Sequence, residues 1–156
     1  MRRFICIFFL FIIVPTLALG ADLKTMVEGH NDYAMLTGAV ELTGKPVEKE
    51  GSTSKGYIYH VNGVDVGFIV KEGNVSSCYC IASDENIGEF LSQAASALLN
   101  IAGIENVAYC YARLLDQYLM AKIGEESQNY PFIENVVMFY VKKSDGKYTF
   151  LAAILK

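Results

Sequence analysis

Outside the first twenty residues, three cysteines and two histidines are the side chains best suited to nucleophilic or metal chemistry. They are Cys78, Cys80, Cys110, His30 and His60. A thiol becomes a nucleophile when a neighbouring histidine takes its proton, and such partners need not be close in sequence. Neither histidine has a second ligand at metal spacing, and Cys78-x-Cys80 lacks the two-residue gap usual in zinc sites. We therefore expect no catalytic, cofactor or metal site, with a thiol enzyme as the alternative.

The first twenty residues are typical of a secretory signal peptide. Arg2 and Arg3 precede an uncharged apolar run over residues 4–14, and Ala18 and Gly20 place small residues where a signal peptidase cuts. The apolar run is shorter than the roughly 20 residues of a bilayer-spanning helix. The sequence thus predicts a secreted chain that begins at Ala21 and is free of the membrane after cleavage. An uncleaved membrane anchor is the alternative.

Secretion bears on the cysteines, because oxidising compartments favour disulfides. A ring closed between Cys78 and Cys80 is strained, so one of the two is expected to bond to Cys110, leaving one thiol over. A Cys80–Cys110 bridge joins two predicted helices. The alternative is that all three are buried, reduced side chains.

Composition limits the class of partner. Residues 21–156 are long enough for one domain with its own core. The 13 Lys plus Arg of the whole chain include Arg2 and Arg3, so 11 remain against 17 Asp plus Glu, a net charge of −6. Binding to nucleic acid is not expected, because phosphate contacts need clustered Lys and Arg. An acidic surface suits a basic protein partner or serves solubility alone.

Periodicity predicts helices over residues 22–44, 84–102 and 106–123. The last two are joined by a short loop, which favours an antiparallel pair. Residues 128–156 are predicted to form a C-terminal β-hairpin extension around Ser144-Asp145-Gly146. Residues 56–71 are ambiguous. Asn62-Gly63 favours a hairpin, whereas Tyr57, Val61, Val64 and Phe68 also fit one helical face.

Four short segments occur in an order that resembles the Rap/Tai family of small periplasmic immunity proteins. A Tyr-Cys-Ile turn precedes an amphipathic helix, a second helix follows it, and a Gly-Tyr-Ile stretch lies upstream. A Gly-x-Asn start comes before them all. The matching residues are Gly29 and Asn31, Gly56-Tyr57-Ile58, Tyr79-Cys80-Ile81 with residues 86–99, and residues 112–115.

This resemblance implies a mainly α, compact helical domain over residues 21–156, with 56–71 as a helix. The alternative is an α+β domain in which 56–71 is a hairpin. The implied function is periplasmic inhibition of a peptidoglycan amidase effector through a protruding loop, without catalysis and with a possible homodimer. A non-enzymatic periplasmic α+β binding or envelope-stress protein is the alternative. The candidate partner-binding residues lie in loops 45–55 and 71–77: Lys49, Glu50, Ser52, Thr53, Glu72 and Asn74.

Overall fold

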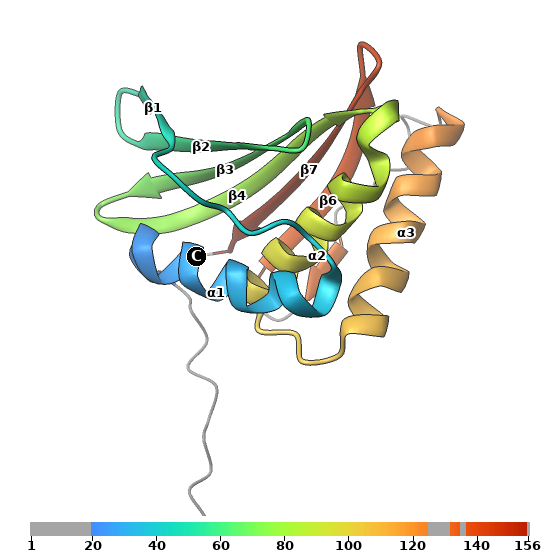
Figure 1. The fold of residues 1–156 in the computed structure, drawn as a ribbon, viewed down its shortest axis with the longest axis horizontal. Helices are drawn as coiled ribbons and strands as arrows, with labels where there is room; N and C mark the ends of the chain where they lie inside the picture. Colours follow the sequence, from blue (N-terminus) through green and yellow to red (C-terminus); the bar gives the residue numbers. More distant parts are fainter. Residues whose placement is uncertain (1–19, 125–131, 135–136, 156) are drawn as a thin grey trace, which may run out of the picture.

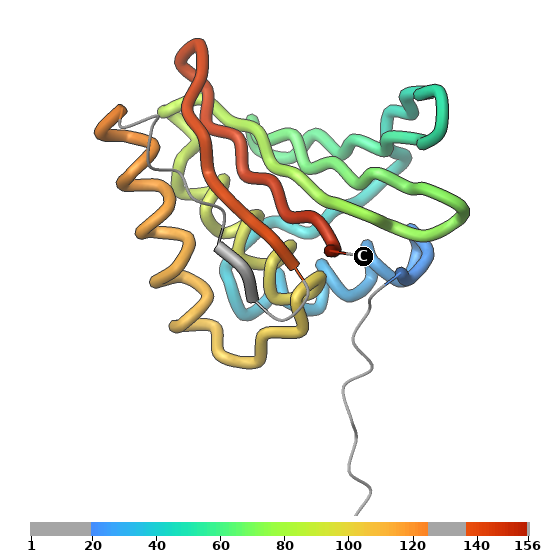
Figure 2. The backbone as a smooth tube through the Cα atoms, turned by 180° about the vertical axis from the view of Figure 1, so that it is seen from behind, coloured from blue at the N-terminus to red at the C-terminus, as the bar shows by residue number. Residues whose placement is uncertain are grey.

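A computed structural model describes residues 20–124, 132–134 and 137–155. Within them, three helices lie on one face of a seven-stranded antiparallel sheet (Figure 1). The helices are α1 (Leu23–Thr37), α2 (Ile87–Ala102) and α3 (Val107–Ile123), and a short 3-10 helix, η1 (Asp84–Asn86), precedes α2. In order across the sheet, the strands are β1 (Val47–Glu50), β2 (Lys55–Val61), β3 (Val64–Lys71), β4 (Asn74–Ser83), β7 (Lys147–Ile154), β6 (Val137–Ser144) and β5 (Phe132–Glu134). Seen from behind, the described sheet carries no helix on its other face (Figure 2).

The prediction of a mainly α domain is wrong, because the fold is α+β. Residues 56–71 form strands β2 and β3, and β4 begins within the segment expected to be a loop. Asn62 and Gly63 both have positive φ, at 46° and 76°, as a type I′ hairpin turn requires. The turn chemistry therefore prevails over the helical reading implied by the family resemblance.

The C-terminal hairpin is confirmed, with Asp145 and Gly146 at its turn, but it is not an extension of a separate domain. Strand β7 pairs with β4 along its length, and β6 pairs with β7. The hairpin therefore completes the central sheet. Residues 128–131, 135–136 and 156 of the predicted extension lie outside the described residues, as do residues 1–19 of the predicted signal peptide.

Helix α1 begins and ends at well-defined caps. The Asp22 side chain accepts a hydrogen bond from the Thr25 amide at 2.8 Å, and Gly38 ends the helix with φ at 75°. The predicted helix over residues 22–44 is therefore too long at its end. Asn31 holds the segment that follows, since its side chain both accepts from the Leu42 amide and donates to the Leu42 carbonyl.

The predicted helix pair is confirmed as α2 and α3, although the two do not run as a tight antiparallel hairpin. The chain bends by 119° between them, so the helices cross obliquely. Helix α2 packs on β4 and lies between α1 and α3 on the face of the sheet, and most of its residues from 93 to 102 are fully buried. Among the described residues, no single helix is long and apolar enough to cross a membrane, and only the bent α2–α3 pair passes that test when joined.

Alternation along the strands builds the core. Every second residue of β3, β4, β7 and β6 points toward the helices, and most of these are fully buried. The largest buried side chains of the sheet are aromatic and belong to the core beneath the helices. They are Phe68, Phe139, Tyr148 and Phe150.

Candidate functional site

The helices do not cover the whole inner face of the sheet. They pack mainly on β4, β6 and β7, whereas β1 and the start of β2 project beyond them (Figure 1). The inner face of this projecting end carries the charged side chains of Glu50 and Lys55 beside Tyr57.

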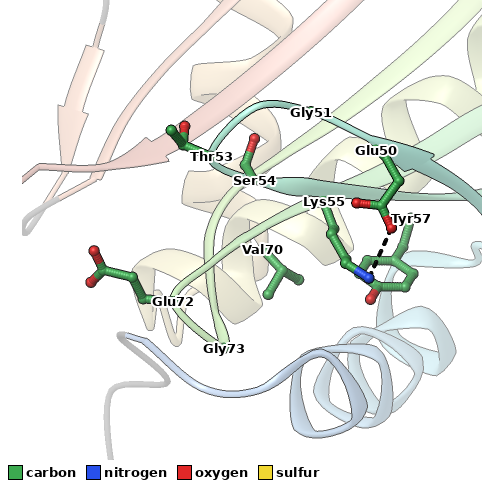
Figure 3. A pocket seen from close by; sticks show the side chains of 9 residues that line it. All are labelled: Glu50, Gly51, Thr53, Ser54, Lys55, Tyr57, Val70, Glu72 and Gly73. Carbon is green, nitrogen blue, oxygen red and sulfur yellow. Dashed lines mark ion pairs between the residues drawn. The ribbon is translucent and has the colours of Figure 1, made fainter.

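An open cleft of about 490 Å³ lies at this end, between the β1–β2 loop and the β3–β4 turn (Figure 3). Val70 of β3 lies between Lys55 and the β3–β4 turn, and Tyr57 stands beside Lys55 on β2 (Figure 3). The cleft thus combines an apolar part with a charged rim. Its lining residues are Glu50, Gly51, Thr53, Ser54, Lys55, Tyr57, Val70, Glu72 and Gly73.

One ion pair fixes the β1–β2 side of the cleft. Lys55 Nζ lies 2.9 Å from Glu50 Oε1, and both side chains are at least half exposed. The hydrogen bond and the charge of Glu50 raise the pKa of Lys55, and Tyr57 and Glu48 add to the effect. The exposed pair contributes little to stability because water screens it. Its effect is to orient the Glu50 carboxylate at the cleft.

The structure brings the two predicted partner-binding loops together. Glu50 and Thr53 from the first loop, and Glu72 from the second, line the same cleft. The other three candidates lie outside it. Lys49 faces the opposite side of the sheet in β1, Ser52 is exposed in the loop, and Asn74 begins β4 next to Gly20.

The expected disulfide between Cys110 and Cys78 or Cys80 is a prediction that the structure contradicts. All three thiols are free and buried. Cys78 and Cys80 point from β4 into the core, whereas the Cys110 thiol on α3 donates to the Ala95 carbonyl of α2 at 3.8 Å. Helix α3 packs on α2 and β6, so Cys110 is carried away from β4.

Burial also disfavours the ionised form of these thiols. It raises the pKa of Cys78 and of Cys110 to about 12 each, and it raises the pKa of Cys80 well above its ordinary value. The thiolate is the nucleophilic form of cysteine, so almost none of it is present at neutral pH. A thiol enzyme would require one of these groups to be both ionised and accessible.

The two histidines lie in unlike surroundings. His60 is exposed on the outer face of the sheet, where its Nδ1 lies 2.6 Å from Asp65 Oδ1 across the β2–β3 hairpin. His30 is buried between α1 and α2, and burial lowers its pKa to about 4. Neither joins a metal site, because the described residues contain no group of three or more His, Cys, Asp or Glu side chains suitably placed.

Sequence reasoning missed a polar seam in the core, formed by α1 and the α2 side chains that face it. Gln93 donates to the Val40 carbonyl and to Glu89, both at 2.7 Å, so its oxygen is left to accept from His30 Nε2. Nearby, Thr37 and Ser96 share a 2.6 Å hydrogen bond. The spacing of Gln93, Ser96 and Asn100 on one helical face is the signal that could have revealed it.

A second missed cluster lies at the opposite end of the sheet from the cleft. Lys143 Nζ donates to Asp84 Oδ2 at 3.2 Å and to the Tyr148 hydroxyl at 3.1 Å. The hydrogen bond from Lys143 is the main reason that the pKa of Asp84 lies below its ordinary value. This contact joins η1, the 3-10 helix that precedes α2, to the β6–β7 hairpin, so we assign it a structural role.

Comparisons with protein-family models, with curated proteins and with solved structures found no match for this chain. The function must therefore be argued from the site itself.

Proposed function

We propose that this chain is an exported, non-catalytic α+β binding protein whose cleft at the β1–β2–β3 end takes a positively charged segment of a protein partner. The observation that carries the proposal is that two loops, distant in sequence, place Glu50 and Glu72 around one cleft with an apolar part. A lysine or arginine side chain suits such a site, because its apolar stem can lie on Val70 and Tyr57 while its charge meets the carboxylates.

The charges around the cleft also favour a basic partner over an acidic one. Glu50 and Glu72 line the cleft beside a single lysine, Lys55, and Glu48 is close enough to Lys55 to influence its pKa. The chain from Ala21 onward has a net charge of −6, which favours approach of a basic partner.

The remaining chemistry supports binding over catalysis. The three thiols and His30, which could act as nucleophile and base, are enclosed in the core and held in their neutral forms. The exposed pair His60–Asp65 lies on the outer face, and the cleft lining contains neither residue. A general base needs its target proton within hydrogen-bonding reach, so the His60–Asp65 pair is not placed to act on a molecule bound in the cleft.

Binding can be tested with a fluorescent peptide rich in Lys and Arg, compared with an acidic peptide of equal length. We expect saturable binding of the basic peptide, and a several-fold weaker affinity in Glu50→Gln and in Glu72→Gln. Glu28→Gln is the matched control, because it removes the same charge from an exposed position on α1. Equal weakening in all three variants, or preference for the acidic peptide, would contradict the proposal.

Inhibition of a peptidoglycan amidase, the narrower function implied by the Rap/Tai resemblance, stays a prediction. Its Gly56-Tyr57-Ile58 match lies in strand β2, so the fold lends no support to a family helix there. The test is an activity assay of an amidase encoded beside this gene. Loss of activity on addition of the protein, and retention with the Glu50→Gln and Glu72→Gln double variant, is the expected result of cleft-mediated inhibition.

A further inference from the structure

The outer face of the sheet carries a continuous apolar row. Strand register places six residues side by side across six strands, from β1 to β6, all pointing away from the helices. Only the glycine interrupts the side chains, and the Tyr79 ring of the neighbouring strand lies over it. In order, the row is Val47, Ile58, Gly67, Tyr79, Leu151 and Tyr140.

Charges of opposite sign lie at the two ends of the neighbouring row on the same face. The next row begins with the pair His60–Asp65 on β2 and β3 and ends with Lys142 on β6. Strand β4 lies at the centre of the sheet, with three strands on each side. Asp65 on β3 and Lys142 on β6 therefore lie on opposite sides of β4, at the same height along the strands.

We propose that a second copy of this chain covers the outer face, with a two-fold axis running along β4. A rotation about this axis leaves each row at the same position along the strands. It also places the strands of the second copy in the opposite order, so Lys142 of one copy comes opposite the His60–Asp65 pair of the other. The same operation brings Ile58 opposite Tyr140 and places two Tyr79 rings together at the centre. Face-to-face packing of two sheets is an established way to bury such rows.

The face approaches the size of a standard protein interface. Six strands spaced by about 4.8 Å, with an average length of about seven residues of 3.4 Å each, span roughly 600 Å² before the relief of the side chains is counted. A standard interface buries about 800 Å² on each partner. The estimate predicts a dimer whose formation depends on concentration.

Sedimentation equilibrium on the chain from Ala21 onward, which contains every described element, tests the dimer. We expect a monomer–dimer equilibrium whose dissociation constant rises at least about tenfold in Leu151→Lys. Leu119→Lys is the matched control, because Leu119 is an exposed leucine on α3, on the helical side of the molecule. Its dissociation constant should not change.

The charge contact gives a second test that does not disturb the apolar row. Lys142 is exposed, and the variant Lys142→Glu should weaken the dimer several-fold. The double variant Lys142→Glu with Asp65→Lys should recover most of the lost affinity. The proposal is overturned by a protein that remains monomeric up to about 1 mM, or by a dimer that Leu119→Lys dissociates and Leu151→Lys does not. Failure of either kind leaves the cleft proposal untouched, since the cleft lies on the inner side of the sheet.

Discussion

His30 Nε2 lies 2.7 Å from Gln93 Oε1 in the buried contact between α1 and α2, while its Nδ1 has no hydrogen-bond partner. Gln93 uses its amide protons elsewhere, so its oxygen accepts and the imidazole donates from Nε2. Burial lowers the pKa of His30 to about 4, so the ring is neutral at neutral pH, and its centroid lies 6.1 Å from that of Phe68 in an edge-on arrangement. Adding a proton would place an unpaired charge in the core.

Stability should fall as the pH is lowered through the range in which His30 titrates. The pKa of His30 is about 4 in the folded chain against an ordinary value of 6.5, so the unfolded chain binds the proton more readily. The contribution is complete above pH 6.5 and is lost progressively as the pH falls toward 4, by up to about 3 kcal/mol. Urea unfolding at pH 7 and pH 5 measures it.

The variant His30→Phe isolates this effect. It removes the titrating group and keeps an aromatic ring, so its loss of stability between pH 7 and pH 5 should be smaller than that of the unmodified protein. An equal loss in both proteins would show that other groups cause the pH dependence.

Two glycines on helices should respond in opposite ways to alanine. A Cβ at Gly29 of α1 would collide with Asn100 Oδ1 of α2, whose amide also donates to the Met26 carbonyl. Gly29→Ala should therefore destabilise the fold by about 1–3 kcal/mol. Gly88→Ala is the control, because no atom lies within 4 Å of its Cβ position, and it should stabilise α2 by up to about 1 kcal/mol. Thermal unfolding of both variants distinguishes them.

The contact between Asp84 and Lys143 should be visible in the titration of Asp84. The hydrogen bond from Lys143 holds the pKa of this carboxyl below 3.8. In Lys143→Met, NMR titration should show the pKa of Asp84 moving back toward 3.8. Because a lowered carboxyl pKa favours the folded state above the unfolded value, this stabilisation is lost only as the pH falls below about 4. An unchanged Asp84 titration in the variant would contradict the assignment.

The three cysteines should be protected from thiol reagents. Cys78, Cys80 and Cys110 have no exposed surface, so the native chain from Ala21 onward should react with none of its thiols. All three should react after denaturation in the absence of reductant. Rapid reaction of one thiol in the native protein would favour the thiol-enzyme alternative, and fewer than three thiols after denaturation would indicate a disulfide.

The sequence predicts correctly those parts of the fold that depend on residues close together in the chain, namely two helices and two tight turns. The helices over 87–102 and 107–123 follow from their apolar faces and from Gly103 and Gly124, which end them with positive φ. Asn62-Gly63 and Asp145-Gly146 mark two hairpin turns, because both residues of each pair tolerate the positive φ that the turn requires. Glu72-Gly73 adopts the same turn, with φ at 53° and 83°, but glutamate is not a usual residue there, and β4 was missed.

The two loops of the candidate site could be predicted from the sequence, but not their meeting at one cleft. Glu50 and Glu72 belong to loops that look polar and exposed in the sequence, but nothing local shows that three antiparallel strands return them to one cleft. The family resemblance also assigned Tyr57 to a helix, which hid the pairing of β2 with its neighbours. Long-range register, which single-sequence patterns do not encode, decides both points.

Chemical-shift mapping is the most direct test of the cleft. A ¹⁵N-labelled chain from Ala21 onward is titrated with the basic peptide, and each backbone amide is followed. The proposal predicts shifts concentrated in residues 50–57 and 70–73, and their loss in the Glu50→Gln and Glu72→Gln double variant. Shifts confined to the outer face or to α3, or no shifts at saturating peptide, would contradict it.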